Sequence, residues 1–149
     1  MDARRIAEGG LTGTAATVAM TGWMAAGRLT GRHGEPPPKR LVRRIARRLG
    51  VPARRSSAGT WLASAAAHGA FGAGCGALYA AAVPRSTPAR GMAFGLGVWA
   101  VSYLGWIPAL GLLPPPYRDN PRRAWTTLTA HLVYGAVLGA GLSRRERRV

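Results

Sequence analysis

The segment Ser64–Ala77 reads SAAAHGAFGAGCGA, and a related segment near the end of the chain, Thr127–Ala140, reads TLTAHLVYGAVLGA. Both follow one pattern: a hydroxyl, three residues, His, two residues, an aromatic ring, Gly-Ala, two residues and Gly-Ala. Residues four apart lie on one face of an α-helix, so each copy predicts a helix with a hydroxyl, an imidazole and two glycines along one stripe. Faces made of such small residues let helices approach closely in lipid.

Two groups of candidate residues come from this stripe. Polar side chains within a membrane helix usually face another helix, so the hydroxyls and imidazoles predict an intramembrane polar site. Its members are Ser64, His68, Thr127 and His131. The glycines predict points where two backbones cross. They are Gly72, Gly76, Gly135 and Gly139.

The charged residues are segregated along the chain. Asp, Glu, Lys and Arg are absent from 56–84, 91–117 and 124–143, and a fourth stretch near the N-terminus contains one charge, Glu8. Each stretch has at least 20 residues, about the length that crosses a hydrocarbon core of about 30 Å. The pattern predicts an all-α integral membrane protein. Its four transmembrane helices are expected at about 6–27, 58–83, 91–113 and 124–143.

Further repeats indicate two tandem helical hairpins within one membrane domain, 1–149. Gly-Trp-x2-Ala occurs at 22–26 and again at 105–109, and each copy is followed by three prolines, at 36–38 and 114–116. The predicted halves are 6–83 and 91–143. Pro108 removes a backbone hydrogen bond and predicts a kink in the third span. A cleaved signal peptide is the alternative for the first span.

The first predicted loop contains a basic amphipathic segment, 38–50. Its apolar residues form a narrow stripe, and its cations form the opposite face, which favours a helix lying in the membrane interface over a solvated charge run. The predicted ligands of anionic lipids are Lys39, Arg40, Arg43, Arg44, Arg47 and Arg48.

Tryptophans and cations indicate how the spans are oriented. An interfacial belt is predicted, because the indole ring prefers the depth at which its N–H meets water. The belt consists of Trp23, Trp61, Trp106 and Trp125. Loops 28–57 and 114–123 on that side carry 13 of the 21 Lys and Arg residues. The positive-inside rule therefore predicts that these two loops are cytoplasmic.

The net charge of +16 does not by itself indicate a nucleic-acid partner. The arginines bracket apolar spans and do not form one face interleaved with aromatic rings, so the predicted partners are the lipid bilayer and its anionic lipids. The sequence leaves the oligomeric state open, and a homo-oligomer is one state that it allows. Cys75 is the sole cysteine, so no intrachain disulfide is expected.

One region resembles a known family. The segment 102–115, SYLGWIPALGLLPP, followed by Ala130–Gly135, AHLVYG, is similar to the YagU-like family of small bacterial inner-membrane proteins. The resemblance covers most of the chain. It implies a functionally uncharacterised, multi-pass protein of the bacterial inner membrane and supplies no catalytic residue.

Three functions from different classes remain open. The histidines could only orient helices, which predicts a structural or interaction protein of the bilayer. They could line a proton or small-solute pathway, or ligate a haem between helices. The chain has no paired carboxylates within a span, no Ser-His-Asp set and no phosphate-binding glycine loop beside a strand. We therefore expect neither enzyme activity nor a site for a metal ion. A structural protein or a solute pathway would also need no cofactor.

Overall fold

The computed structural model describes residues 2–29, 44–48, 50 and 58–147. These residues form helices and connecting turns, with no strand among them, and this confirms the predicted all-α class. The long helices are α1 (Ala3–Leu29), α3 (Ala58–Ala82), α4 (Pro88–Ala100) and α6 (Pro121–Glu146). A π-helix, η1 (Val101–Trp106), and a short helix, α5 (Ile107–Ala109), continue α4.

Local sequence explains where the helices of the second hairpin begin. α4 follows Thr87, whose side chain accepts a hydrogen bond from the Arg90 N–H, and α6 follows Asn120, which does the same for Arg122. Each cap is followed by proline, which needs no hydrogen-bond acceptor in the first helical turn. α6 begins before its predicted apolar span because of its Asn120 cap, and it also continues past the end of that span.

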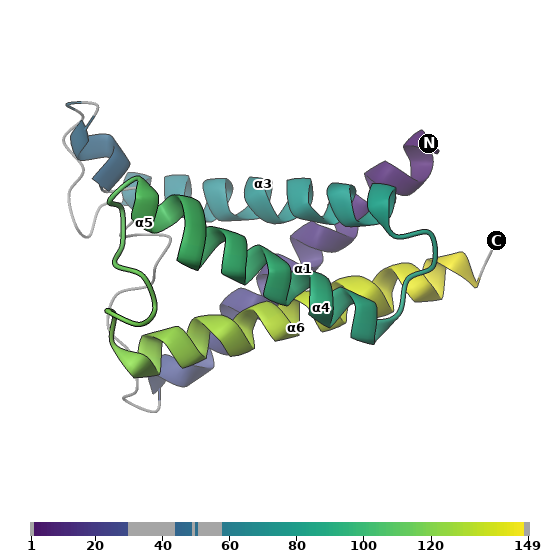
Figure 1. The fold of residues 1–149 in the computed structure, drawn as a ribbon. Coiled ribbons are helices and arrows are strands. Elements are labelled where there is room, and N and C mark those ends of the chain that lie inside the picture. The colour runs from purple at the N-terminus through teal and green to yellow at the C-terminus, as the bar shows by residue number, and fades with distance from the viewer. Residues whose placement is uncertain (1, 30–43, 49, 51–57, 148–149) are drawn as a thin grey trace.

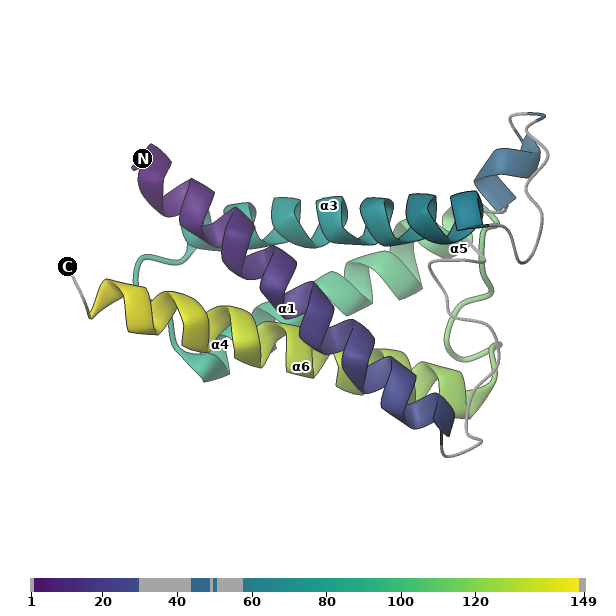
Figure 2. The ribbon, with the colours of Figure 1, turned by 180° about the vertical axis from the view of Figure 1, so that it is seen from behind.

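The helices form two antiparallel hairpins. α1 packs along α3, α4 packs along α6, and α1 also packs against α6, which joins the hairpins, whereas α3 and α4 barely touch (Figure 1). The view from behind shows α1 crossing α6 (Figure 2). Both termini and the connection between α3 and α4 lie at one end of the molecule, as expected for an even number of antiparallel helices.

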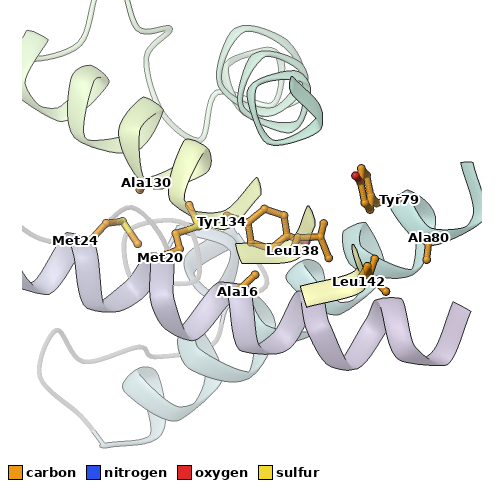
Figure 3. Close-up of a cluster of buried hydrophobic side chains, with 9 residues drawn as sticks. All are labelled: Ala16, Met20, Met24, Tyr79, Ala80, Ala130, Tyr134, Leu138 and Leu142. Carbon is orange, nitrogen blue, oxygen red and sulfur yellow. The ribbon is translucent and has the colours of Figure 1, made fainter. Parts of the chain in front are cut away.

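The hairpins are held together at glycine crossings. In the first hairpin, a Cβ added at Gly13 would overlap the backbone of Gly72, and in the second, a Cβ added at Gly91 would overlap that of Gly135. Backbones can approach this closely only without side chains between them. The buried cluster is correspondingly small and comes from α1, α3 and α6 (Figure 3). Its members are Ala16, Met20, Met24, Tyr79, Ala80, Ala130, Tyr134, Leu138 and Leu142.

The third predicted span is kinked. η1 has π-type bonding, with the Ile107 N–H donating to the carbonyl of Ser102, five residues back, and Gly105 leaves helical geometry at φ −101° and ψ −108°. Pro108 has no N–H and its ring clashes with the carbonyl four residues earlier, so the regular ladder is interrupted just before it. The break is centred on Gly105, because glycine has no side chain and its backbone adopts angles that other residues rarely do.

The termini are tied together by polar contacts. The Arg5 guanidinium donates to the carbonyls of Ala80 (2.9 Å) and Val83 (2.6 Å) at the end of α3 and also to Glu146 (2.7 Å) near the end of α6. Glu146 accepts hydrogen bonds from the N–H and hydroxyl of Ser86. Arg5 thus satisfies carbonyls at the end of α3 in its own hairpin, and its bond with Glu146 joins the two termini.

One segment of the described chain, Pro88–Ala109, is long and apolar enough to cross a membrane by length and composition. No other helix of the described residues meets the same test of length and composition. This finding is weak evidence for membrane association. The predicted topology of four transmembrane helices stays a prediction.

Candidate functional site

A cavity of about 250 Å³ lies between the two hairpins. Its walls come from α1, α3, η1 with the end of α4, and α6, and it occupies the region where α3 and α4 barely touch. Most of its surface is apolar. The larger apolar side chains on it are Met20, Met24, Phe71, Trp99, Trp106 and Ile107.

The four predicted polar residues all line this cavity: Ser64, His68, Thr127 and His131. The histidines occupy corresponding positions, each about three turns into its helix. Both imidazoles line the same cavity. The structure therefore brings the members of the two sequence copies to one place, while their role stays a prediction.

The hydroxyls of the motif bond to their own helices. Ser64 Oγ donates to the Thr60 carbonyl (2.6 Å), and Thr127 Oγ1 donates to the carbonyls of Arg123 and Ala124 (both 3.0 Å). Such bonding to a preceding turn satisfies a hydroxyl inside a helix bundle. Thr127 Oγ1 also accepts a hydrogen bond from the Trp99 indole (3.3 Å).

His131 has a defined tautomer in its neutral form. Its Nδ1 lies 2.7 Å from the Thr127 carbonyl oxygen. A carbonyl oxygen can only accept, so Nδ1 carries the hydrogen and Nε2 of the neutral ring is a hydrogen-bond acceptor. One side of the cavity thus presents an imidazole whose orientation and tautomer are set by its own helix.

Two tyrosines on the cavity wall connect distant parts of the chain. Tyr134 OH donates to the Gly72 carbonyl (2.7 Å), which links α6 to α3, and Tyr103 OH donates to Asp119 in the turn before α6. Asp119 also pairs with Arg123, and its side chain is only 5% exposed. The contacts of Asp119 lie at the end of the bundle where α6 begins, whereas the Tyr134–Gly72 bond lies about halfway along α6 and α3.

The environment of Asp119 favours its charged form. Burial by itself would raise the pKa of this carboxyl, but hydrogen bonds from Tyr103, the Asn120 N–H and Arg123, together with the charge of Arg123, outweigh it. The pKa of Asp119 is therefore below its usual value. The sequence analysis gave this residue no role. Its spacing of four from Arg123 was the available signal.

The four predicted crossing glycines lie between backbones. A Cβ at Gly76 would overlap Gly9, and one at Gly139 would overlap Thr87, while Gly72 and Gly135 face Thr17 and Gly91. Their partners in the first helix of each hairpin were missed. The signal was again a spacing of four between small residues: Gly9, Gly13 and Thr17 in α1, and Gly91 and Gly95 in α4.

The predicted belt tryptophans all belong to the ends of helices that meet at one end of the molecule (Figure 1). Trp23, Trp61, Trp106 and Trp125 are exposed there, and the Trp23 indole donates to Thr129 Oγ1 (3.1 Å). Their position is common to both hairpins, and their role at an interface stays a prediction.

Part of the predicted lipid-binding helix is described. Residues 44–48 are helical, and Arg44 donates to the carbonyls of Gly111 (2.9 Å) and Leu112 (2.5 Å) beyond α5. Arg44 thus contacts the protein backbone, whereas Arg47 and Arg48 are exposed. Lys39, Arg40 and Arg43 lie outside the described residues. Among the residues that are described, no group of three His, Cys, Asp or Glu side chains could hold a metal ion.

Residues 3–149 match the model of a family of unknown function, DUF6789, and the chain belongs to this family. No curated protein and no solved structure matched the chain in the corresponding comparisons. The match agrees with the expectation of an uncharacterised family but does not confirm the resemblance to the YagU-like family.

Proposed function

We propose that this member of a family of unknown function is a four-span protein of the bacterial inner membrane that binds a small, largely apolar molecule between its hairpins. The resemblance to the YagU-like family points in the same direction. In this proposal the protein holds or passes the molecule and does not transform it chemically. The proton-pathway and haem alternatives stay predictions.

The outer surface of the helices supports membrane insertion. Large apolar side chains are exposed along α1, α3, α4 and η1, and one, Trp125, near the start of α6. Exposed apolar surface of this kind is typical of a protein that contacts lipid or a partner. The most exposed include Leu11, Val18, Leu62, Leu78, Val101 and Leu104. Charged residues of the described helices lie near the helix ends, where headgroups and water would solvate them.

The cavity is the observation that carries the binding proposal. Protein interiors are close-packed, and a void that is left empty lowers stability. A pure scaffold would gain from filling this space, yet two histidines and several hydroxyls converge on it. A dry apolar cavity of about 150 Å³ can hold benzene, so about 250 Å³ is sufficient for a substituted ring.

The proposed topology places loops 28–57 and 114–123 in the cytoplasm, with exposed Arg47 and Arg48 near anionic headgroups. Single-cysteine variants in a Cys75→Ala background test this arrangement. Arg85→Cys and Tyr117→Cys are suitable positions because both residues are exposed and lie at opposite ends of the bundle. In intact cells a membrane-impermeant maleimide should label Arg85→Cys and spare Tyr117→Cys. Extraction of the protein from membranes by alkaline carbonate would contradict insertion.

Cys75 reports on the cavity, because it is the sole cysteine of the chain and lies on the cavity wall. We expect p-cymene, an apolar substituted benzene, to slow the reaction of Cys75 with N-ethylmaleimide in detergent-solubilised protein. Val98→Phe narrows the cavity and should weaken this protection, while Leu96→Phe, on the same helix but not on the cavity wall, should preserve it. An unchanged labelling rate with every ring compound tried would overturn the binding proposal.

A further inference from the structure

Five of the six hydroxyl side chains on the described cavity wall donate their hydrogens to the protein, and the sixth, Ser102, can donate or accept. Thr17 Oγ1 donates to the Gly13 carbonyl (2.9 Å), as Ser64 and Thr127 donate to preceding turns of their own helices. Tyr134 OH donates to Gly72, and Tyr103 OH donates to Asp119. The oxygen of a hydroxyl that has donated its hydrogen retains lone pairs and can only accept. These five side chains therefore offer acceptors to any occupant.

His131 and Trp99 add to the same bias, whereas His68 and the second indole on the wall, Trp106, can still donate. Neutral His131 presents Nε2 as an acceptor because Nδ1 donates to Thr127. The Trp99 N–H already donates to Thr127 Oγ1. His68 has one donor and one acceptor nitrogen in its neutral form, so it accommodates either kind of partner.

The remaining lining residues define the rest of the occupant. No Asp, Glu, Lys or Arg lies on the described cavity wall, so a charged ligand would enter without a counter-ion, at a high desolvation cost. Aromatic rings and the two methionine thioethers form most of the apolar surface, and such groups pack well against flat rings. A neutral molecule with a ring fits this surface best.

The cavity is also accessible from the side of the bundle. Phe71 of α3 and Trp106 of η1 both line it and are both partly exposed, with their ring centroids 6.4 Å apart. They lie on the side where α3 and α4 barely touch. In the proposed membrane setting this side faces lipid, so the occupant would enter from the bilayer.

Resting on the proposed function, we infer that the occupant is a neutral, ring-containing lipophile that donates a hydrogen bond through a hydroxyl group, the chemical class of phenols and hydroquinones. Its hydroxyl hydrogen meets the acceptors formed by the threonine, serine and His131 side chains. A quinone or ether of similar shape offers only acceptors, so it can pair only with donors such as Ser102 and His68 and leaves the acceptors of the wall without a partner. The cavity would thus discriminate by hydrogen-bond polarity as well as by shape.

Three probes of related size separate these possibilities. Thymol has a ring and a hydroxyl donor, p-cymene is the same molecule without the hydroxyl, and duroquinone is a ring with acceptors only and no free position for addition of the Cys75 thiol. Protection of Cys75 from N-ethylmaleimide is measured against free probe concentration in the same detergent. We expect thymol to protect at about a fivefold lower concentration than p-cymene, as one added hydrogen bond implies, and duroquinone to be the weakest.

Variants assign the preference to the wall. His131→Phe retains a ring and removes Nε2, so thymol should lose its advantage while p-cymene still protects. Thr17→Val removes one acceptor at nearly constant shape and gives an independent measurement if His131→Phe does not fold. Equal protection by thymol and p-cymene, or stronger protection by duroquinone, would overturn the donor inference and leave the binding proposal standing. Protection by none of the three would overturn the binding proposal itself.

Discussion

The two hairpins share a crossing geometry but differ in what their aromatic residue does. Gly72 and Gly135 occupy the same place in the repeated motif, and each lies where its helix crosses the first helix of its hairpin. The preceding residue differs: Phe71 is partly exposed beside Trp106, whereas Tyr134 is buried and reaches across to the first hairpin. The glycines make each hairpin, and the tyrosine joins one hairpin to the other.

The first helices of the hairpins differ as well. α1 runs without a break, while the chain of α4 passes into a π-helix and kinks at Gly105. The copies of the Gly-Trp pair lie further apart in sequence than the packing glycines Gly13 and Gly91, so the repeat is not in register along these helices. Residues of the π-helix also line the cavity, among them Ser102, Tyr103 and Trp106, so the departure from symmetry shapes part of the site.

The largest expected effect concerns the surroundings of the crossing glycines. A Cβ at Gly135 would overlap backbone atoms of Gly91 and Met92, whereas one at Gly72 would mainly meet the side chain of Thr17, which can rotate. We expect Gly135→Ala to destabilise the protein by about 3 kcal/mol and Gly72→Ala by less, measured by thermal unfolding in detergent.

A glycine in open space provides the control for this pair. Gly69 has no neighbour near its missing Cβ, so Gly69→Ala should be neutral or stabilising through helix propensity, by at most about 1 kcal/mol. Equal melting temperatures of the Gly72→Ala and Gly135→Ala proteins would show that both crossings accommodate an added methyl group equally well.

The second expected effect compares one acidic residue from each hairpin. Asp119 is nearly buried and bonded to Arg123 and Tyr103, whereas Glu8 forms an i, i+4 pair with Arg4, whose side chain is 72% exposed. Asp119→Asn should cost about 2 kcal/mol, and Glu8→Gln about 0.5 kcal/mol or less. Detergent melting at neutral pH measures both.

Acidification tests the same contrast. Because the folded-state pKa of Asp119 is lowered, its stabilising contribution is present above the unfolded value of about 3.9 and is lost as pH falls through the folded value. The difference in melting temperature between the parent and Asp119→Asn should therefore shrink below about pH 4. A difference that is constant from neutral pH to pH 3 would contradict this assignment.

The third effect tests the bond between the hairpins. Tyr134→Phe removes the hydroxyl that donates to the Gly72 carbonyl and should destabilise by about 1 kcal/mol, because the buried carbonyl loses a partner. Phe71→Leu changes the corresponding residue of the first hairpin on an exposed surface and should have a smaller effect in detergent. If the two variants have the same melting temperature, the hydrogen bond of Tyr134 adds no stability beyond what the residue at position 71 contributes.

The smallest effect concerns the histidines themselves. His68 and His131 line one cavity, so His68→Ala and His131→Ala should be non-additive, with an interaction energy of about 0.5 kcal/mol or more. A double-mutant cycle in detergent gives this value directly. Strict additivity would place the histidines in independent environments, in spite of the shared cavity.

Local pattern alone was sufficient to predict much of the architecture. The spacing of four between Ser64, His68 and Gly72, repeated at Thr127, His131 and Gly135, predicted two helices of one kind, because helical periodicity depends only on neighbours along the chain. The segregation of charge predicted four long helices with ends close to those observed. Pro108 predicted the interruption of the third span, since the missing N–H is a property of the residue itself.

Tertiary structure decided which of these residues meet and which part of the chain contacts them. Whether His68 and His131 share a cavity depends on how α3 and α6 are placed by α1, a long-range arrangement that no local spacing encodes. The contact of Tyr134 with Gly72, the recruitment of Asp119 by Tyr103 and the docking of Arg44 on Gly111 likewise join segments far apart in sequence or across a turn. On the cavity wall, the bonds of the two tyrosines follow from those placements, whereas the threonine, serine and His131 bonds are made within one helix. Tertiary structure gathers the resulting acceptors around one cavity, and the donor character expected of the occupant depends on that gathering.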